Sequence, residues 1–186
     1  MHAPEGPAVI GGGGGDLNHA TNVAQGRKQL GELLGAGHPF AARAAEIEVN
    51  EFQGLEDRRS YYQHNSGSGS HIRTGPEIGS DVIVHEYIHG LEYRDPTMHA
   101  NAIAFRDRRT AGEALVDITP AGGTHGKEYC KPDQFFNKYC GKVYDHAATE
   151  IMTMGIQRIC TDAGGFAKED PDYFKFIASE LRRSHG

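Results

Sequence analysis

The segment from His85 to His89 has the residue types and spacing best suited to catalysis, because it reads His-Glu-Tyr-Ile-His, an HExxH pattern. In a helix, side chains four residues apart lie one turn apart on the same face, so the imidazoles of His85 and His89 can bind one metal ion. Two imidazoles leave room on a tetrahedral zinc ion for a third protein ligand and a water, as in catalytic zinc sites. Glu86 can accept a proton from that water as it attacks a carbonyl. The pattern therefore predicts a Zn2+-dependent hydrolase with Glu86 as general base.

The third zinc ligand must come from elsewhere in the chain, and two glutamates compete for this role. Glu150 lies 61 positions beyond His89, at the start of another predicted helix, and Glu113 lies 24 positions beyond His89. Glu113 is followed at i+4 by Asp117, an order that resembles thermolysin-like enzymes, in which the aspartate orients a ligand histidine. The residues by themselves leave both glutamates open.

A hydrolase of this kind also needs a hydrogen-bond donor for the oxyanion that forms on the attacked carbonyl. The candidates are tyrosines and histidines in the loops that precede the helix of Glu150: His125, Tyr139, Tyr144 and His146.

The composition is that of one globular domain with its own core, since 38% of the 186 residues are hydrophobic and 24% are charged. The formal net charge is -6, and no run of Lys and Arg exceeds two residues. Binding to a nucleic acid backbone or to an anionic membrane surface is therefore disfavoured. The expected partner is a peptide or protein substrate.

The three cysteines and the N-terminus bear on the compartment. Cys130, Cys140 and Cys160 form no CxxC pair and cannot all pair with one another, which favours reduced thiols. No apolar run approaches the ~20 residues of a membrane span, and the N-terminus lacks the basic region and apolar stretch of a secretory signal. We expect a cytoplasmic protein, or one exported without a recognisable signal peptide.

Hydrophobic periodicity and turn residues divide the chain into elements. Residues 1–17, with five consecutive glycines, predict a flexible tail before a single domain of residues 18–186. Alternation predicts strands at 45–52, 61–63 and 71–73. Ser80 and Asp81 are the expected caps of the helix that carries HExxH. Helical spacing predicts helices at 19–34, 80–93, 97–109, 111–118, 146–160 and 172–183, with a long loop at 119–144.

Four segments between residues 81 and 181 also carry a resemblance to a known family. They are VIVHEYIHGLEY, FRDRRTAGE, YCGKVYDHAATEIMTMGIQ and DPDYFKFIASEL. Together they resemble a zincin-like metallopeptidase family found in phage head-associated and toxin-like bacterial proteins. In that family a tE-x-x-S-M-G block follows a GK-x-Y segment. This chain matches the block with Thr149, Glu150, Met154 and Gly155 and has Thr153 in place of the serine.

The resemblance implies Glu150 rather than Glu113 as third ligand, and it favours Tyr144, in the GK-x-Y segment, as the oxyanion donor. The expected fold is α+β and zincin-like: a small sheet packed on the active-site helix, with a mainly helical C-terminal half. The expected function is a zinc metallopeptidase. The alternatives are a virion-associated or structural module with a non-catalytic zinc site, and a zinc hydrolase of non-peptide substrates. A purely structural site has no use for Glu86 as a general base.

Overall fold

The structure is a computed structural model that describes residues 2–5, 19–35, 37–44, 46–51, 59–65, 69–75, 78–120, 126–144 and 148–184. Within these ranges the chain forms α-helices and short strands. The helices are α1 (His19–Leu34), α2 (Pro39–Ala44), α3 (Ser80–Arg94), α4 (Pro96–Arg109), α5 (Ile151–Glu169) and α6 (Pro171–Ser184), with the 3-10 helix η1 (Lys138–Gly141). The strands are β1 (His2–Glu5), β2 (Glu48–Glu51), β3 (Tyr61–Asn65), β4 (Gly69–Thr74), β5 (Val116–Asp117), β6 (Tyr129–Cys130) and β7 (Lys142–Val143).

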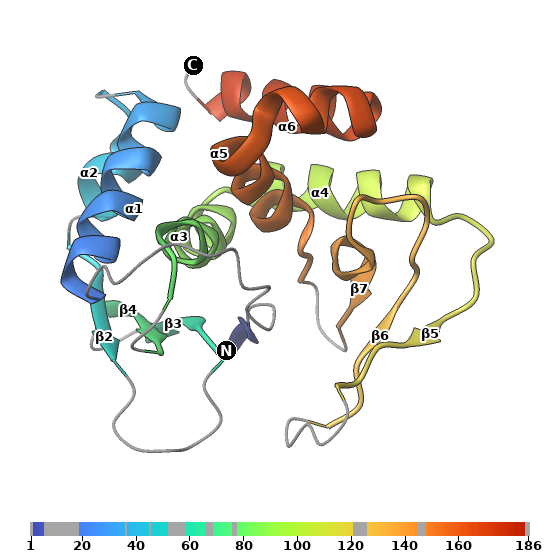
Figure 1. The fold of residues 1–186 in the computed structure, drawn as a ribbon, viewed down its shortest axis with the longest axis horizontal. Helices are drawn as coiled ribbons and strands as arrows, with labels where there is room; N and C mark the ends of the chain where they lie inside the picture. The colour runs from blue at the N-terminus through green and yellow to red at the C-terminus, as the bar shows by residue number, and fades with distance from the viewer. Residues whose placement is uncertain are drawn as a thin grey trace.

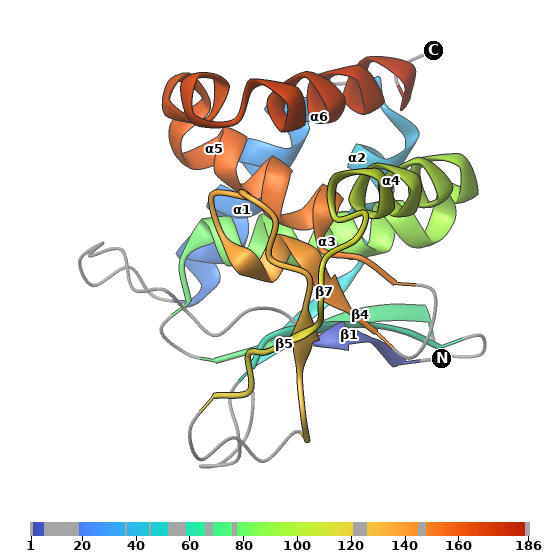
Figure 2. The same cartoon turned by 90° about the vertical axis from the view of Figure 1, so that its right-hand side faces the viewer.

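The strands form two small sheets. The first has the order β1-β3-β4-β2: β3 and β4 are an antiparallel hairpin, β1 pairs antiparallel with β3, and β2 pairs parallel with β4. The second is the antiparallel sheet β5-β6-β7. In Figures 1 and 2 the helices lie mainly above the strands. The chain is therefore α+β, with helices and strands segregated into layers.

Helix α3 lies at the centre of the molecule, between α1 and α5 and above β3 (Figure 1). All its residues from Val82 to Glu92 are buried. Arg27 of α1 links α1 to α3 and to the residue before β2. Its guanidinium donates to Tyr87 Oη at 2.8 Å and to the Ile47 carbonyl at 2.9 Å. A helix enclosed on all sides carries its polar residues into the interior, where they need partners or a function.

The C-terminal half encloses α3 from the other side. Asp95 caps α4 by accepting from the Met98 backbone N–H at 2.9 Å, directly before Pro96 in the first turn. Tyr173 of α6 is fully buried among aromatic rings from α4, α5 and the loop before η1, including Phe105, Phe166 and Phe135. This aromatic cluster fixes α6 against α4 and α5 and so completes the core around the HExxH helix.

Several expected elements agree with the structure. The helix expected at 19–34 is confirmed as α1, and those at 80–93, 97–109 and 172–183 are α3, α4 and α6 with ends within one residue. The strand expected at 61–63 is the first part of β3, and that at 71–73 lies within β4. The strand expected at 45–52 is shorter, since β2 spans residues 48–51, and residues 45 and 52 lie outside the described residues.

The N-terminal segment differs from the expected tail in one part. Residues 2–5 form β1 on the edge of β3, whereas residues 1 and 6–18 lie outside the described residues. The pairing is made by backbone groups, which a composition rich in glycine and proline does not reveal.

The region after α4 also needs correction, because no helix forms at 111–118. Gly112 has φ of 82°, a left-handed conformation that ends helical geometry, and Val116 and Asp117 form β5 instead. The loop expected at 119–144 contains β6, η1 and β7, whose pairing joins residues that are far from each other in the sequence.

Two helix starts differ from expectation. Gly79 is the N-cap of α3 and no side chain caps it, so neither Ser80 nor Asp81 acts as the cap. The helix expected at 146–160 begins at Ile151, with Glu150 in the N-cap position. Its expected end lies close to a kink at Asp162, whose φ of -159° and ψ of 73° are not helical, and α5 continues beyond this kink to Glu169. Within the described ranges, none of the helices has the length and apolarity needed to cross a membrane.

We predict that Gly26→Ala destabilises the protein by about 1 to 3 kcal/mol, because overpacking a tight contact has costs of this size. A Cβ at Gly26 would lie 2.6 Å from Ile83 Cγ2 and 2.9 Å from the Ser80 carbonyl oxygen, on the helix that carries the site. The matched control is Gly31→Ala in the same helix, where a Cβ meets nothing within 4 Å. This control is expected to stabilise by up to about 1 kcal/mol. Denaturant unfolding measures both, and equal effects of the two changes would contradict the packing account.

Candidate metal centre

Helix α3 places the two histidines of the HExxH segment side by side. The ring centroids of His85 and His89 are 5.0 Å apart, in an edge-to-face arrangement, and both side chains are buried. This is the proximity expected for residues one helical turn apart on one face.

Glu150 joins the histidines from the start of α5. Its carboxylate makes no capping hydrogen bond; instead Oε2 lies 3.3 Å from His85 Nε2 and 3.6 Å from His89 Nε2. One ligand atom from each of the three residues lies within 4.8 Å of the others. The close packing of α3 against α5 therefore brings together residues 61 positions apart.

The donor set fits a metal ion of the zinc type. The Nε2 atoms of His85 and His89 are buried and lack a hydrogen-bond partner, although they converge on the same carboxylate oxygen. Orphaned buried nitrogens are rare, because each costs the free energy of its lost hydrogen bonds to water. Two imidazole nitrogens and one carboxylate oxygen are a ligand set that zinc prefers.

The charges of the three ligands are strongly coupled. Burial opposes ionisation of Glu150, but His89, His85 and Lys142 outweigh it and lower its pKa to about 2. Burial lowers the pKa of His89 to about 3, so this ring is neutral at physiological pH. Burial also acts to lower the pKa of His85, but the nearby carboxylates of Glu150 and Glu86 outweigh it and raise the pKa. Glu150 thus increases the affinity of His85 for a proton, and a metal ion bound at Nε2 would compete with that proton.

Glu86 lies beside the triad, and burial is the largest influence on its charge. Its side chain is fully buried, and neither carboxylate oxygen has a hydrogen-bond partner. Burial raises its pKa to about 8; the nearby positive charge of His85 opposes this effect, Glu150 adds to it, and the Tyr62 backbone opposes it. A carboxyl group of this kind is a strong proton acceptor next to the histidines.

Two hydroxyl groups hold the Glu150 carboxylate. Tyr144 Oη donates to Oε1, and Thr153 Oγ1 donates to Oε2 at 2.8 Å. Oε2 is the oxygen that faces the histidines. The structure therefore gives Tyr144 a definite partner in the site, the third residue of the triad.

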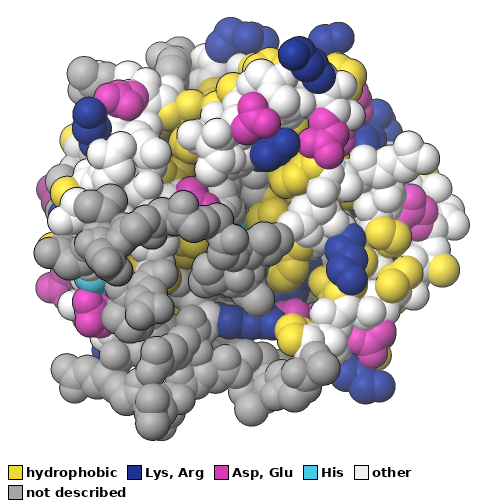
Figure 3. All heavy atoms as spheres, in the orientation of Figure 1, with side chains coloured by type: hydrophobic (Ala, Val, Ile, Leu, Met, Phe, Trp, Pro, Cys, Tyr) yellow, Lys and Arg dark blue, Asp and Glu magenta, His cyan; other side chains and the backbone are white. Residues whose placement is uncertain are grey.

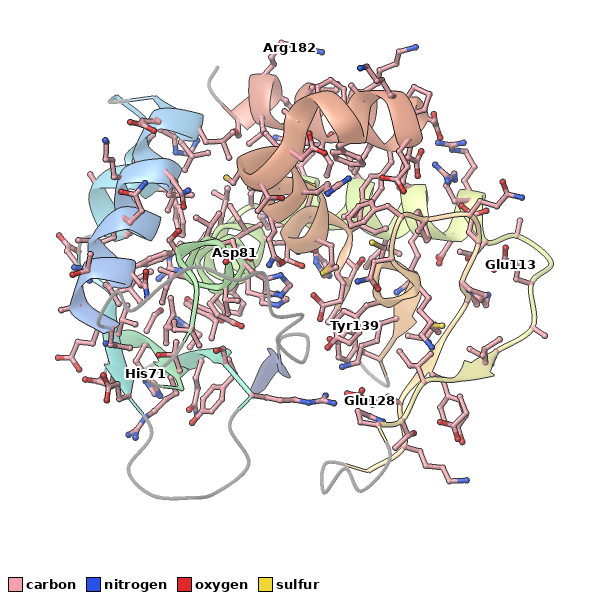
Figure 4. All side chains as sticks on the ribbon, viewed as in Figure 1. His71, Asp81, Glu113, Glu128, Tyr139 and Arg182 are labelled. Carbon is pink, nitrogen blue, oxygen red and sulfur yellow. The ribbon has the colours of Figure 1, made fainter. Side chains whose placement is uncertain are left out.

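A buried charged network supports the tyrosine. Lys142 Nζ donates to Tyr139 Oη and to Glu128 Oε1, each at 2.8 Å, and lies 4.5 Å from the ring centroid of Tyr144. Arg59, just before β3, donates to the same Glu128 oxygen at 2.5 Å. Figure 4 shows Glu128 and Tyr139 close together below the helices. The network links the segment before β3 to β7 and places a positive charge against the Tyr144 ring.

The other sequence candidates lie elsewhere. Glu113 is not part of the triad: its Oε2 accepts from the Asp133 backbone N–H at 2.7 Å, and Figure 4 shows it at the outer edge of the view, apart from α3. Asp117 is exposed and accepts from the Thr119 N–H, so it does not orient a ligand histidine. His125 and His146 lie outside the described residues.

Sequence reasoning missed two side chains that touch the triad. Thr153 contacts Glu150, and Gln157 Oε1 lies 3.1 Å from His85 Nδ1. The two residues follow Glu150 by three and seven positions, which is the spacing of one helix face. That spacing could have identified them once Glu150 was chosen.

The surface of the described residues mixes both signs of charge. On the face drawn in Figure 3, Lys and Arg side chains are interspersed with Asp and Glu over α4, α5 and α6.

No protein-family model, curated protein or solved structure matches the chain. Function is therefore inferred from the residues that form the site and from their geometry.

Glu92, one turn after His89 on α3, is a second buried carboxyl group near the triad. Its Oε1 lies 2.8 Å from His99 Nδ1, whereas Oε2 is buried without a hydrogen-bond partner. Burial raises the pKa of Glu92 to about 7, although its bond to His99 opposes the shift. The folded protein therefore retains a proton on Glu92 that the unfolded chain loses near pH 4.5.

We predict that the free energy of unfolding of wild type falls by roughly 3 kcal/mol as pH rises from 4.5 through 7, because of Glu92. The pKa of Glu92 is higher in the folded protein than in the unfolded chain, so its proton stabilises the folded protein at low pH and is lost as pH rises. Glu92→Gln removes the titrating group, so its free energy of unfolding should fall less over this range. Denaturant unfolding of the metal-free proteins at pH 5 and pH 8.5 measures the difference. Glu48→Gln, at an exposed position on β2, is the control. Parallel pH profiles for wild type and Glu92→Gln would contradict the prediction.

Proposed function

We propose that the protein is a zinc-dependent metallopeptidase. The observation that carries the proposal is the buried convergence of His85 Nε2, His89 Nε2 and Glu150 Oε2, with the unpartnered carboxylate of Glu86 beside them. Evolution seldom retains four buried ionisable groups in one place without a function, because each costs stability.

We also propose that the fold is zincin-like. The HExxH segment lies on a central helix, α3, that packs over a small sheet, and the third ligand comes from the C-terminal helical half. These features agree with the resemblance of residues 81–181 to zincin-like metallopeptidases. They support Glu150 rather than Glu113, whose carboxylate is bonded elsewhere.

His85, His89 and Glu150 would hold the zinc ion. Bound there, zinc supplies Lewis-acid chemistry: it increases the acidity of water and polarises a substrate carbonyl. Three protein ligands leave a coordination position open, which is the property that separates catalytic from structural zinc.

Glu86 is proposed as the general base that takes a proton from the attacking water and passes it to the leaving amine. Its carboxylate is next to His85 and has no competing hydrogen bond. In the metal-free protein its pKa is about 8, and a nearby dication lowers the pKa of a carboxyl group. Its pKa then falls towards neutrality, the range in which a general base is most effective.

Tyr144 is proposed to orient the third ligand. Its hydroxyl bonds Oε1 of Glu150, and this leaves Oε2 directed at the histidines. The oxyanion role expected for Tyr144 requires that its hydroxyl leave Glu150 when substrate is bound. Its position in the site is compatible with both roles, and a variant separates them.

We predict about one zinc per wild-type chain after dialysis against a weak chelator, since the three ligands form a complete protein set for a catalytic site. Glu150→Ala should lose the metal, while Glu113→Ala is the matched control that should keep it. Tyr144→Phe should bind zinc roughly tenfold more weakly, because it loses a bond that orients Glu150. Elemental analysis and chelator competition give these values. A wild-type protein that holds no zinc would refute the proposal. Unchanged zinc affinity in Tyr144→Phe with a lower kcat would assign the tyrosine to the oxyanion.

We predict that Glu86→Gln keeps zinc but loses at least ~100-fold in peptide hydrolysis, the size of a general base contribution. His85→Ala and His89→Ala should lose both zinc and activity. Cleavage of a quenched-fluorescence peptide library, followed by mass spectrometry of the products, measures activity. Full activity in Glu86→Gln would exclude this residue as the base. Zinc retention by a wild-type protein that cleaves no peptide would favour a non-catalytic zinc module or a hydrolase of other substrates.

A further inference from the structure

We propose that Gln157 and Asp81 are positioning residues that select the imidazole tautomer of His85 and so present its Nε2 lone pair to the metal. The inference rests on the proposed zinc site and extends it by two residues that lie outside the HExxH pattern. Gln157 is on the second turn of α5, and Asp81 is in the first turn of α3.

The three side chains form a continuous hydrogen-bonded chain across the two helices. His85 Nδ1 lies 3.1 Å from Gln157 Oε1, and Gln157 Nε2 donates to Asp81 Oδ2 at 2.8 Å. Asp81 is one turn before His85 on α3, so the chain begins and ends on one helix and passes through the other. Figure 4 shows Asp81 on α3 near the centre of the molecule.

The chemistry of the groups fixes the direction of every bond. A carboxylate only accepts hydrogen bonds, so the amide of Gln157 must turn its NH2 group towards Asp81. Its oxygen then faces His85 and can only accept. Nδ1 of His85 therefore carries the proton, and in the neutral ring Nε2 has the free lone pair. That nitrogen is the one that faces Glu150 and lacks a hydrogen-bond partner.

Asp81 has no competing role in the helix. Gly79 occupies the N-cap position of α3, and no side-chain capping hydrogen bond is made there. The Asp81 carboxylate is therefore available to Gln157. Its other oxygen, Oδ1, lies against Gly79, where a Cβ would be 2.3 Å away. A glycine at this position therefore permits the conformation that the chain of bonds requires.

The test is zinc affinity, measured by competition with a chromophoric chelator on the full chain. Gln157→Leu should weaken binding roughly 10- to 100-fold, as loss of a partner that orients a ligand histidine does. Asp81→Asn, which has the same size, should weaken zinc binding roughly tenfold. An amide at position 81 can both donate and accept, so the Gln157 amide can flip and present its NH2 group to His85. Asp81→Glu should restore affinity, since it returns an acceptor-only group. Asp172→Asn, a first-turn acid of α6, is the control and should bind like wild type.

A spectroscopic readout separates tautomer selection from a general structural effect. In 15N spectra of the metal-free protein, recorded at a pH at which the ring is neutral, His85 should show a protonated Nδ1 and an unprotonated Nε2 in wild type and in Asp81→Glu, and a mixture of both tautomers in Gln157→Leu. Zinc affinity equal to wild type in both Gln157→Leu and Asp81→Asn would overturn the inference and leave the zinc site intact. A wild-type chain that binds no zinc would instead remove the proposed function and this inference with it. Asp81→Asn keeps the test valid if Gln157→Leu does not fold.

Discussion

The packing of α3 against α5 is the contact on which the rest of the structure depends. It encloses the HExxH helix from the side opposite α1 and brings Glu150 within 3.3 Å of His85 Nε2. The same contact sets Gln157 beside His85 Nδ1. One helix pair therefore supplies both the ligand atoms and the groups that orient them. The aromatic cluster around Tyr173 packs α6 against α5 and so stabilises the position of α5 on α3.

Burial gives the site its chemical character. Imidazole and carboxyl groups that are removed from water interact strongly with one another, because little solvent screens their charges. Glu150 is held as a carboxylate by the histidines, whereas Glu86, with no hydrogen-bond partner, has its pKa raised to about 8. Two glutamates that interact with the same histidine, His85, thus differ in proton affinity. The difference agrees with the roles proposed for them, metal ligand for Glu150 and general base for Glu86.

The supporting polar groups come from widely separated parts of the chain. Lys142 and Arg59 share Glu128, and Lys142 also bonds Tyr139 and lies over the ring of Tyr144. These charges are buried but paired, which is the condition under which interior charges are tolerated. Their arrangement connects the first sheet to the second across the site.

The sequence by itself determined the residues with local signatures. The i, i+4 spacing placed His85 and His89 on one helix face, and hydrophobic periodicity located α1, α3, α4 and α6, because both patterns depend on neighbours within one or two turns. The residues alone left Glu150 and Glu113 open, and the resemblance favoured Glu150. The tertiary structure then showed that Glu150 lies beside the histidines and Glu113 does not, because α5 packs on α3. It also replaced the helix expected at 111–118 by a strand, because Gly112 is left-handed and β6 offers a partner. The bonds of Asp81 and Tyr144 had no signature in spacing, and Gln157 could be placed by its spacing from Glu150 only once that ligand was chosen, because these bonds join side chains that folding brings together.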